Sequence, residues 1–88
     1  MKVEIKKMDY KDAMAAGITD WPVWSKEVSR FDWEYDSEEH CYILEGKVVV
    51  ETEDGNYEIE AGDYVIFPQG LRCTWDIKSA IRKHYDFK

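Results

Sequence analysis

The sequence has few of the features that mark secreted, membrane or nucleic-acid-binding proteins. Its 88 residues contain two cysteines, too few for the disulfide framework of a small secreted domain. Hydrophobic runs are short, as at Val48–Val50 and Val65–Phe67, so no segment predicts a transmembrane helix. Acidic residues outnumber basic ones, 19 to 12, and the net charge of −7 leaves no basic stripe to follow a phosphate backbone.

The acidic charge and the composition exclude several classes of partner and of protein. We expect neither nucleic acid nor an anionic membrane surface as a partner, because both repel an acidic chain. The opening residues Met1–Glu4 do not resemble a signal peptide, which predicts a cytoplasmic location and reduced thiols. The 44% of hydrophobic and 15% of aromatic residues exclude a disordered tail and predict one domain over residues 1–88.

Alternation and turn residues predict a mainly β chain. Met1–Lys7 alternates in polarity as a half-buried strand does, and one short helix is expected near residues 10–16, with Asp9 as its N-cap. Asp54-Gly55 predicts a type I′ hairpin, whose two central residues need positive φ. Short strands separated by turn signals predict an all-β sandwich or a closed barrel, whose interior can hold one small ligand.

Two segments carry a more specific signal. Residues 39–46 read Glu-His-Cys-Tyr-Ile-Leu-Glu-Gly, and residues 62–70 read Gly-Asp-Tyr-Val-Ile-Phe-Pro-Gln-Gly. They resemble the two signature motifs of the cupin superfamily, with Glu39 at the motif glutamate and Gly46 at the motif glycine. The resemblance implies an all-β fold, a small cupin-type jelly-roll β-barrel with one short N-terminal helix.

The histidines that bind metal in cupins are missing from this chain. The resemblance implies two histidines, a glutamate and a third histidine that together hold a divalent cation. The three histidine positions fall on Trp33, Tyr35 and Cys73, which leaves Glu39 as the one ordinary ligand. A metal site needs three or four converging ligands, so we predict no metal and no other cofactor. Zinc on Glu39 and Cys73 would be the least surprising exception.

A closer resemblance covers residues 21–85. Residues 33–35 read Trp-Glu-Tyr, residues 67–75 read Phe-Pro-Gln-Gly-Leu-Arg-Cys-Thr-Trp, and residues 82–85 read Arg-Lys-His-Tyr. These pieces look like a subfamily of small single-domain cupins, related to the ureidoglycine aminohydrolase cupin domain and without an assigned function. Cupins as a class include storage proteins, enzymes and ligand-sensing domains, so the resemblance implies fold more than chemistry.

Strand alternation predicts a set of inward side chains. If Glu39 faces the interior, side chains two residues apart share that face, whereas the neighbouring His40 points away. The set combines aromatic walls with one carboxylate and two thiols: Trp33, Tyr35, Glu39, Cys41, Cys73 and Trp75. We interpret it as the lining of a pocket for a small polar metabolite, bound without a metal.

Glu39 is the strongest candidate in this set. An inward carboxylate is costly to bury unless it is paired or hydrogen-bonded. Glu39 is therefore either a functional group or a structural partner of Arg72, Tyr35 or His84. As a functional group it would bind a ligand or act as a general acid or base, with its pKa raised by apolar walls.

Three functions stay open at this point. The first is a binding module, and the second is a metal-independent isomerase, lyase or hydrolase that uses Glu39 as its catalytic acid or base. A catalytic Cys73 would need a cationic neighbour to become a thiolate. The third is an interaction protein with a filled barrel, in which exposed Trp21 and Trp24 pack a homodimer. An open cavity separates the third from the others, and turnover of a ligand separates the second from the first.

Overall fold

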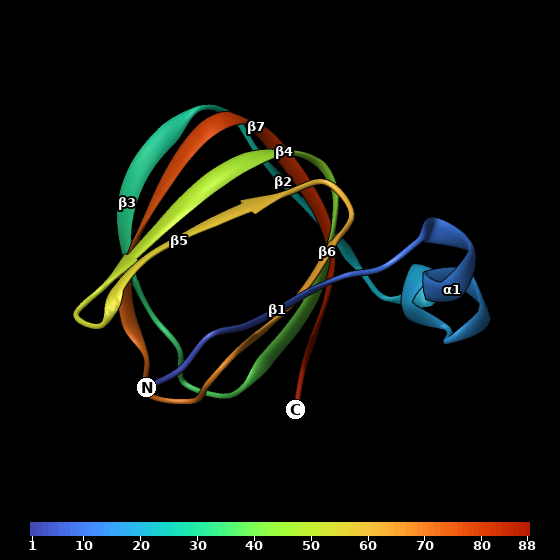
Figure 1. Ribbon diagram of the computed structural model, residues 1–88, viewed down its shortest axis with the longest axis horizontal. Coiled ribbons are helices and arrows are strands. Elements are labelled where there is room, and N and C mark those ends of the chain that lie inside the picture. Colours follow the sequence, from blue (N-terminus) through green and yellow to red (C-terminus); the bar gives the residue numbers. More distant parts are fainter.

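The computed structural model describes residues 1–88 as a barrel of antiparallel strands with one short helix beside it (Figure 1). The elements follow in the order β1 (Glu4–Lys7), α1 (Tyr10–Ala15), the 3₁₀ turn η1 (Ile18–Asp20), β2 (Val23–Lys26), β3 (Ser29–Glu34), β4 (Glu39–Thr52), β5 (Gly55–Glu60), β6 (Asp63–Phe67) and β7 (Arg72–Phe87). The prediction of an all-β chain with one helix near residues 10–16 is confirmed.

Two long strands organise the barrel. β4 and β7 pair with each other along most of their length. The first and second halves of each strand lie in different faces of the barrel, where they pair with different neighbours. The first half of β4 pairs with β6, which pairs with β1, whereas its second half pairs with β5. β7 pairs with β3 along its first half and with β2 along its second half. The core therefore lies between two faces that share their central strands.

Gly46 marks the place where β4 passes from one face to the other. Its φ is 96°, and a Cβ at this position would collide with the backbone carbonyl of Ala80 on β7. The β4–β7 register shifts three times between Ile43 and Val48, and such bulges let a strand bend. The motif glycine thus lets β4 continue through the bend as one strand.

The β4–β5 hairpin turns one residue earlier than predicted. Thr52 pairs with Gly55, which leaves Glu53 and Asp54 as the loop. No residue other than glycine has a positive φ, so the type I′ prediction is wrong at Asp54. The positive φ of 128° falls on Gly55, whose carbonyl accepts a hydrogen bond from the Thr52 hydroxyl.

The helix packs on the outside of the barrel. Ala13 and Ile18 form a small buried cluster with Tyr42, whose hydroxyl donates to the Met8 carbonyl at 2.8 Å. This cluster is separate from the main core inside the barrel, and Figure 1 shows α1 beside the strands. Neither helical segment has the length and hydrophobicity needed to cross a bilayer.

Candidate ligand-binding site

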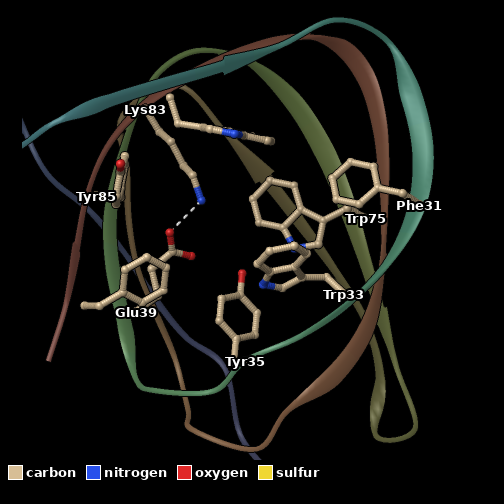
Figure 2. Close-up of a pocket in the computed structure, with 9 residues that line it drawn as sticks. Phe31, Trp33, Tyr35, Glu39, Trp75, Lys83 and Tyr85 are labelled. Carbon is tan, nitrogen blue, oxygen red and sulfur yellow. Dashed lines mark hydrogen bonds and ion pairs between the residues drawn. The ribbon is translucent and has the colours of Figure 1, made fainter.

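The barrel interior contains a partly open cavity. Its volume is about 220 Å³, and seven of its nine lining residues are aromatic (Figure 2). The aromatic residues are Trp24, Phe31, Trp33, Tyr35, Trp75, Tyr85 and Phe87. The other two are Glu39 and Lys83. This volume corresponds to about seven water molecules in the liquid, which suits a small metabolite.

Paired strands bring the lining residues together. Phe31 on β3 lies opposite Trp75 on β7, so their side chains share one face of the pair. Further along β7, alternation turns Lys83 and Tyr85 to the same interior. Glu39 begins β4 and pairs with Phe87 near the end of β7. The cavity therefore depends on the register between β4 and β7.

Glu39 and Lys83 form a buried ion pair in the cavity wall. The Lys83 Nζ donates to Oε2 of Glu39 at 2.8 Å, and the two residues are 3% and 5% exposed. The ammonium also lies 4.6 Å from the ring centre of Trp75 and 5.1 Å from that of Trp24. Both ring faces attract the cation. Because desolvation offsets most of the attraction in a buried pair, stability alone is a poor explanation for it.

Two buried polar atoms at the cavity lack a hydrogen-bond partner. They are Oε1 of Glu39 and Nε1 of Trp75. Buried polar atoms in folded proteins are nearly always paired, so an orphaned atom beside a cavity indicates where a ligand or an ordered water would bond. Glu39 thus uses one oxygen for Lys83 and keeps the other free.

Tyr35 adds a hydroxyl to the same region. Burial raises the pKa of the Tyr35 phenol well above its ordinary value, and the negative charge of Glu39 raises it further. The group therefore stays protonated at neutral pH and can donate a hydrogen bond. Its ring is stacked on Phe67 with the centroids 4.9 Å apart, and Figure 2 shows the hydroxyl pointing toward the carboxylate.

Four of the six side chains predicted for the pocket line the cavity, namely Trp33, Tyr35, Glu39 and Trp75. Trp33 is 49% exposed and lies at the cavity mouth together with the 48% exposed Phe87. Cys41 and Cys73 are buried in the main core but are not part of the lining. The structure thus separates the two thiols from the aromatic and charged groups.

The chemistry of the two cysteines follows from their burial. Burial raises the pKa of the Cys41 thiol to about 12 and that of the Cys73 thiol to about 11. The nearby indole N–H of Trp75 and the charge of Lys83 lower the Cys73 pKa, but by less than burial raises it. Both cysteines are free and protonated at neutral pH, which is the wrong state for a nucleophile.

The partner of Glu39 is a residue that sequence reasoning missed. Of the three expected partners, Tyr35 lies in the same cavity lining as Glu39, and the carboxylate charge acts on its phenol. Arg72 is exposed and pairs with Glu34 at 3.2 Å. His84 faces the opposite side of β7 from Lys83 and donates to the Trp21 carbonyl at 2.9 Å.

The sequence did contain a signal for Lys83. Ile81, Lys83 and Tyr85 share one face of β7, so a lysine between two apolar residues of alternating spacing predicts an inward ammonium. The same rule would have found Phe87 and, on the paired strand β3, Phe31. His40 points away from the cavity as expected, and its ring nitrogens bond Tyr64 and Glu38.

The donor set does not fit the divalent metal that the cupin motifs hold. No three His, Cys, Asp or Glu side chains in the chain converge as metal ligands do. The one suitable carboxylate, Glu39, already binds the ammonium of Lys83, which a metal ion would have to displace.

Known proteins resemble the chain in sequence and in fold. A family described as the EutQ-like cupin domain matches residues 14–85. A DUF861 family protein from Thermotoga maritima is 52% identical over 99% of this chain and 100% of its own, with a TM-score of 0.92. A second DUF861 family protein, from Pseudomonas syringae, is 29% identical over 72% of this chain and 28% of its own, with a TM-score of 0.65.

More distant structures share the fold alone. A putative ethanolamine utilization protein Q from Salmonella typhimurium is 18% identical over 97% of this chain and 68% of its own, with a TM-score of 0.66. Among curated proteins none matches the chain. These comparisons confirm the cupin-type jelly roll, whereas the relation to the ureidoglycine aminohydrolase domain stays a prediction.

Proposed function

The chain belongs to the family of EutQ-like cupin domains, and we propose that it binds a small polar metabolite in the cavity around Glu39 and Lys83. The observation that carries this proposal is the combination of seven aromatic walls with one buried ion pair. Ligand pockets have this composition, mostly apolar with a few convergent polar groups that orient the ligand. The free Oε1 of Glu39 supplies an acceptor that the protein itself leaves unused.

The cavity also bears on the filled-barrel alternative. A barrel that served only as an interaction scaffold would be packed with side chains to the density of a protein core. Here about 220 Å³ is left open between aromatic rings, with two exposed aromatics, Trp33 and Phe87, at its mouth. The packing therefore favours a ligand site over a scaffold.

A metal-independent enzyme is the second candidate, and the ion pair is the observation that favours it. A carboxylate and an ammonium 2.8 Å apart beside a cavity place a base and an acid within reach of one ligand. Glu39 would accept a proton from the substrate, and Lys83 would stabilise the charge that develops. A role for Cys73 has less support, because its thiol is protonated and lies outside the lining.

The four tryptophans provide a test with an internal control. Trp24, Trp33 and Trp75 line the cavity, whereas Trp21 does not. The indole N–H signals of the ¹⁵N-labelled protein, assigned through Trp→Phe variants, would be followed while small polar metabolites are added. We expect binders to shift the three cavity signals and to leave Trp21 unchanged. No shift with any metabolite, or shifts at Trp21 alone, would contradict the proposal, and conversion of a bound compound would favour the enzyme.

A further inference from the structure

We infer that the ligand of this cavity is electrically neutral and carries a planar amide-type group whose N–H donates to Oε1 of Glu39. This inference rests on the proposed function and adds the chemical class of the ligand. Three properties of the cavity lead to it: its charge balance, its free hydrogen-bonding groups and the arrangement of its rings.

The charge balance favours a neutral ligand. Glu39 and Lys83 neutralise each other, so the lining carries no net charge. An anion would meet the Glu39 carboxylate and the negative faces of the surrounding rings. A cation would meet the Lys83 ammonium, which already lies over the ring faces of Trp75 and Trp24. In a cavity lined mainly by aromatic rings, either like-charge contact is costly.

The free hydrogen-bonding groups require a ligand that both donates and accepts. Oε1 of Glu39 is buried and has no partner at hydrogen-bond distance, so a donor from the ligand would satisfy it. The Tyr35 hydroxyl stays protonated and points toward the same place, and Nε1 of Trp75 also lacks a partner, so both can donate to a ligand acceptor. An amide group carries an N–H donor and a carbonyl acceptor in adjacent positions, which matches this pair.

The arrangement of the rings favours a flat group. Phe31 and Trp75 are nearly parallel, with an interplanar angle of 18° and centroids 6.3 Å apart. Trp24 meets Trp75 edge to face at 83°, so the walls present both faces and edges of rings. A planar amide can lie against such walls while its N–H and carbonyl stay in its plane. An alcohol has the donor and the acceptor but no flat face.

A series of probes with equal size separates these requirements. Benzamide, benzoate, benzamidinium and acetophenone have the same number of non-hydrogen atoms, and they differ in charge and in hydrogen-bond donors. Dissociation constants would be measured from the indole signals of Trp24, Trp33 and Trp75, with Trp21 as the control. We expect benzamide to bind at least about tenfold more tightly than each of the other three and than benzyl alcohol, a difference near 1.4 kcal/mol.

Two variants test whether the Glu39–Lys83 ion pair causes the cavity to prefer neutral benzamide over the charged probes. In the double variant Glu39→Gln with Lys83→Met, we expect the disadvantage of benzoate and benzamidinium against benzamide to fall below about threefold. Arg82→Met is the matched control, because Arg82 precedes Lys83 on β7 and points to solvent. This control should keep the full preference of the unmodified protein.

The outcomes distinguish the inference from the proposed function. Tightest binding by benzoate or by benzamidinium would overturn the neutral-ligand inference and leave the binding function standing. Tightest binding by acetophenone would overturn the need for a donor to Glu39, and tightest binding by benzyl alcohol would overturn the planar group. A cavity that takes up no probe would overturn the inference, and the binding function would fall with it only if the metabolite titration also gave no shift.

Discussion

Replacing Glu39 by glutamine should destabilise the protein, because it leaves the Lys83 ammonium buried without its counter-ion. Glutamine keeps the shape of the side chain and removes its charge. Removing one member of a buried ion pair typically costs about 3–5 kcal/mol. The rings of Trp75 and Trp24 still face the ammonium in the variant, and a desolvated contact of this kind is worth about 2 kcal/mol. We therefore expect the lower end of the range, about 3 kcal/mol.

That loss is large enough to measure by thermal unfolding. In a domain of this size, each kcal/mol shifts the melting temperature by roughly 4–8 °C, so Glu39→Gln should lower it by roughly 12–24 °C. Lys83→Met should destabilise as well, because it leaves the Glu39 carboxylate unpaired. The double variant should recover most of the loss, since a buried pair replaced as a unit is often neutral or stabilising.

The double-mutant cycle also gives the result that would refute this reasoning. A Glu39→Gln variant that melts within about 3 °C of the unmodified protein would mean that the pair contributes almost nothing. A double variant less stable than both single variants would mean that each residue acts alone. In either case Glu39 would return to the role of an unpaired functional group, which the sequence left open.

Two further perturbations test the core and the bend in β4. Burial raises the pKa values of Cys41 and Tyr35, so the unfolded state loses these protons at lower pH than the folded state does. The free energy of unfolding should therefore fall as pH rises above about 9, by about 1.4 kcal/mol per pH unit for Cys41. Cys41→Ala should make this slope shallower, and an unchanged slope would contradict the reasoning. In urea unfolding, Gly46→Ala should lower the free energy of unfolding by more than about 2 kcal/mol, because the position has a positive φ and the new Cβ collides with β7. Gly17→Ala also has a positive φ but open space around the Cβ, so it should lower the free energy of unfolding by about 1 kcal/mol. Equal losses in the two variants would exclude the collision.

The cupin motif positions and strand alternation together placed much of this site. Trp33, Tyr35, Glu39 and Trp75 were predicted from period-two spacing around the motif glutamate, and all four line the cavity. Spacing says which face a side chain takes but not how deep along the barrel axis it lies. Cys41 therefore shares the face of Glu39, as predicted, yet belongs to the packed layer.

The ion pair could not be predicted in the same way. Lys83 lies 44 residues from Glu39, and their meeting depends on the register of β4 against β7. Three register shifts interrupt that pairing, and nothing in the local pattern fixes their positions. The hairpin fails for a related reason, since Asp54-Gly55 signals a turn without deciding which two residues form its loop. The local sequence pattern thus predicts the strands and which side chains face inward. The long-range register between strands decides which of those side chains meet.

The long pairing of β4 with β7 also has a consequence for how the protein folds. Glu39 pairs with Phe87, so one end of this ladder joins the middle of the chain to its C-terminal end. Pairings of such high sequence separation carry a loop-closure cost before they gain contacts, and chains dominated by them fold on the scale of milliseconds to seconds. The cavity is lined from both ends of this ladder, so it is complete only when these long-range pairings have formed. Ligand affinity is therefore a property of the fully folded chain, and a partly folded intermediate would lack it.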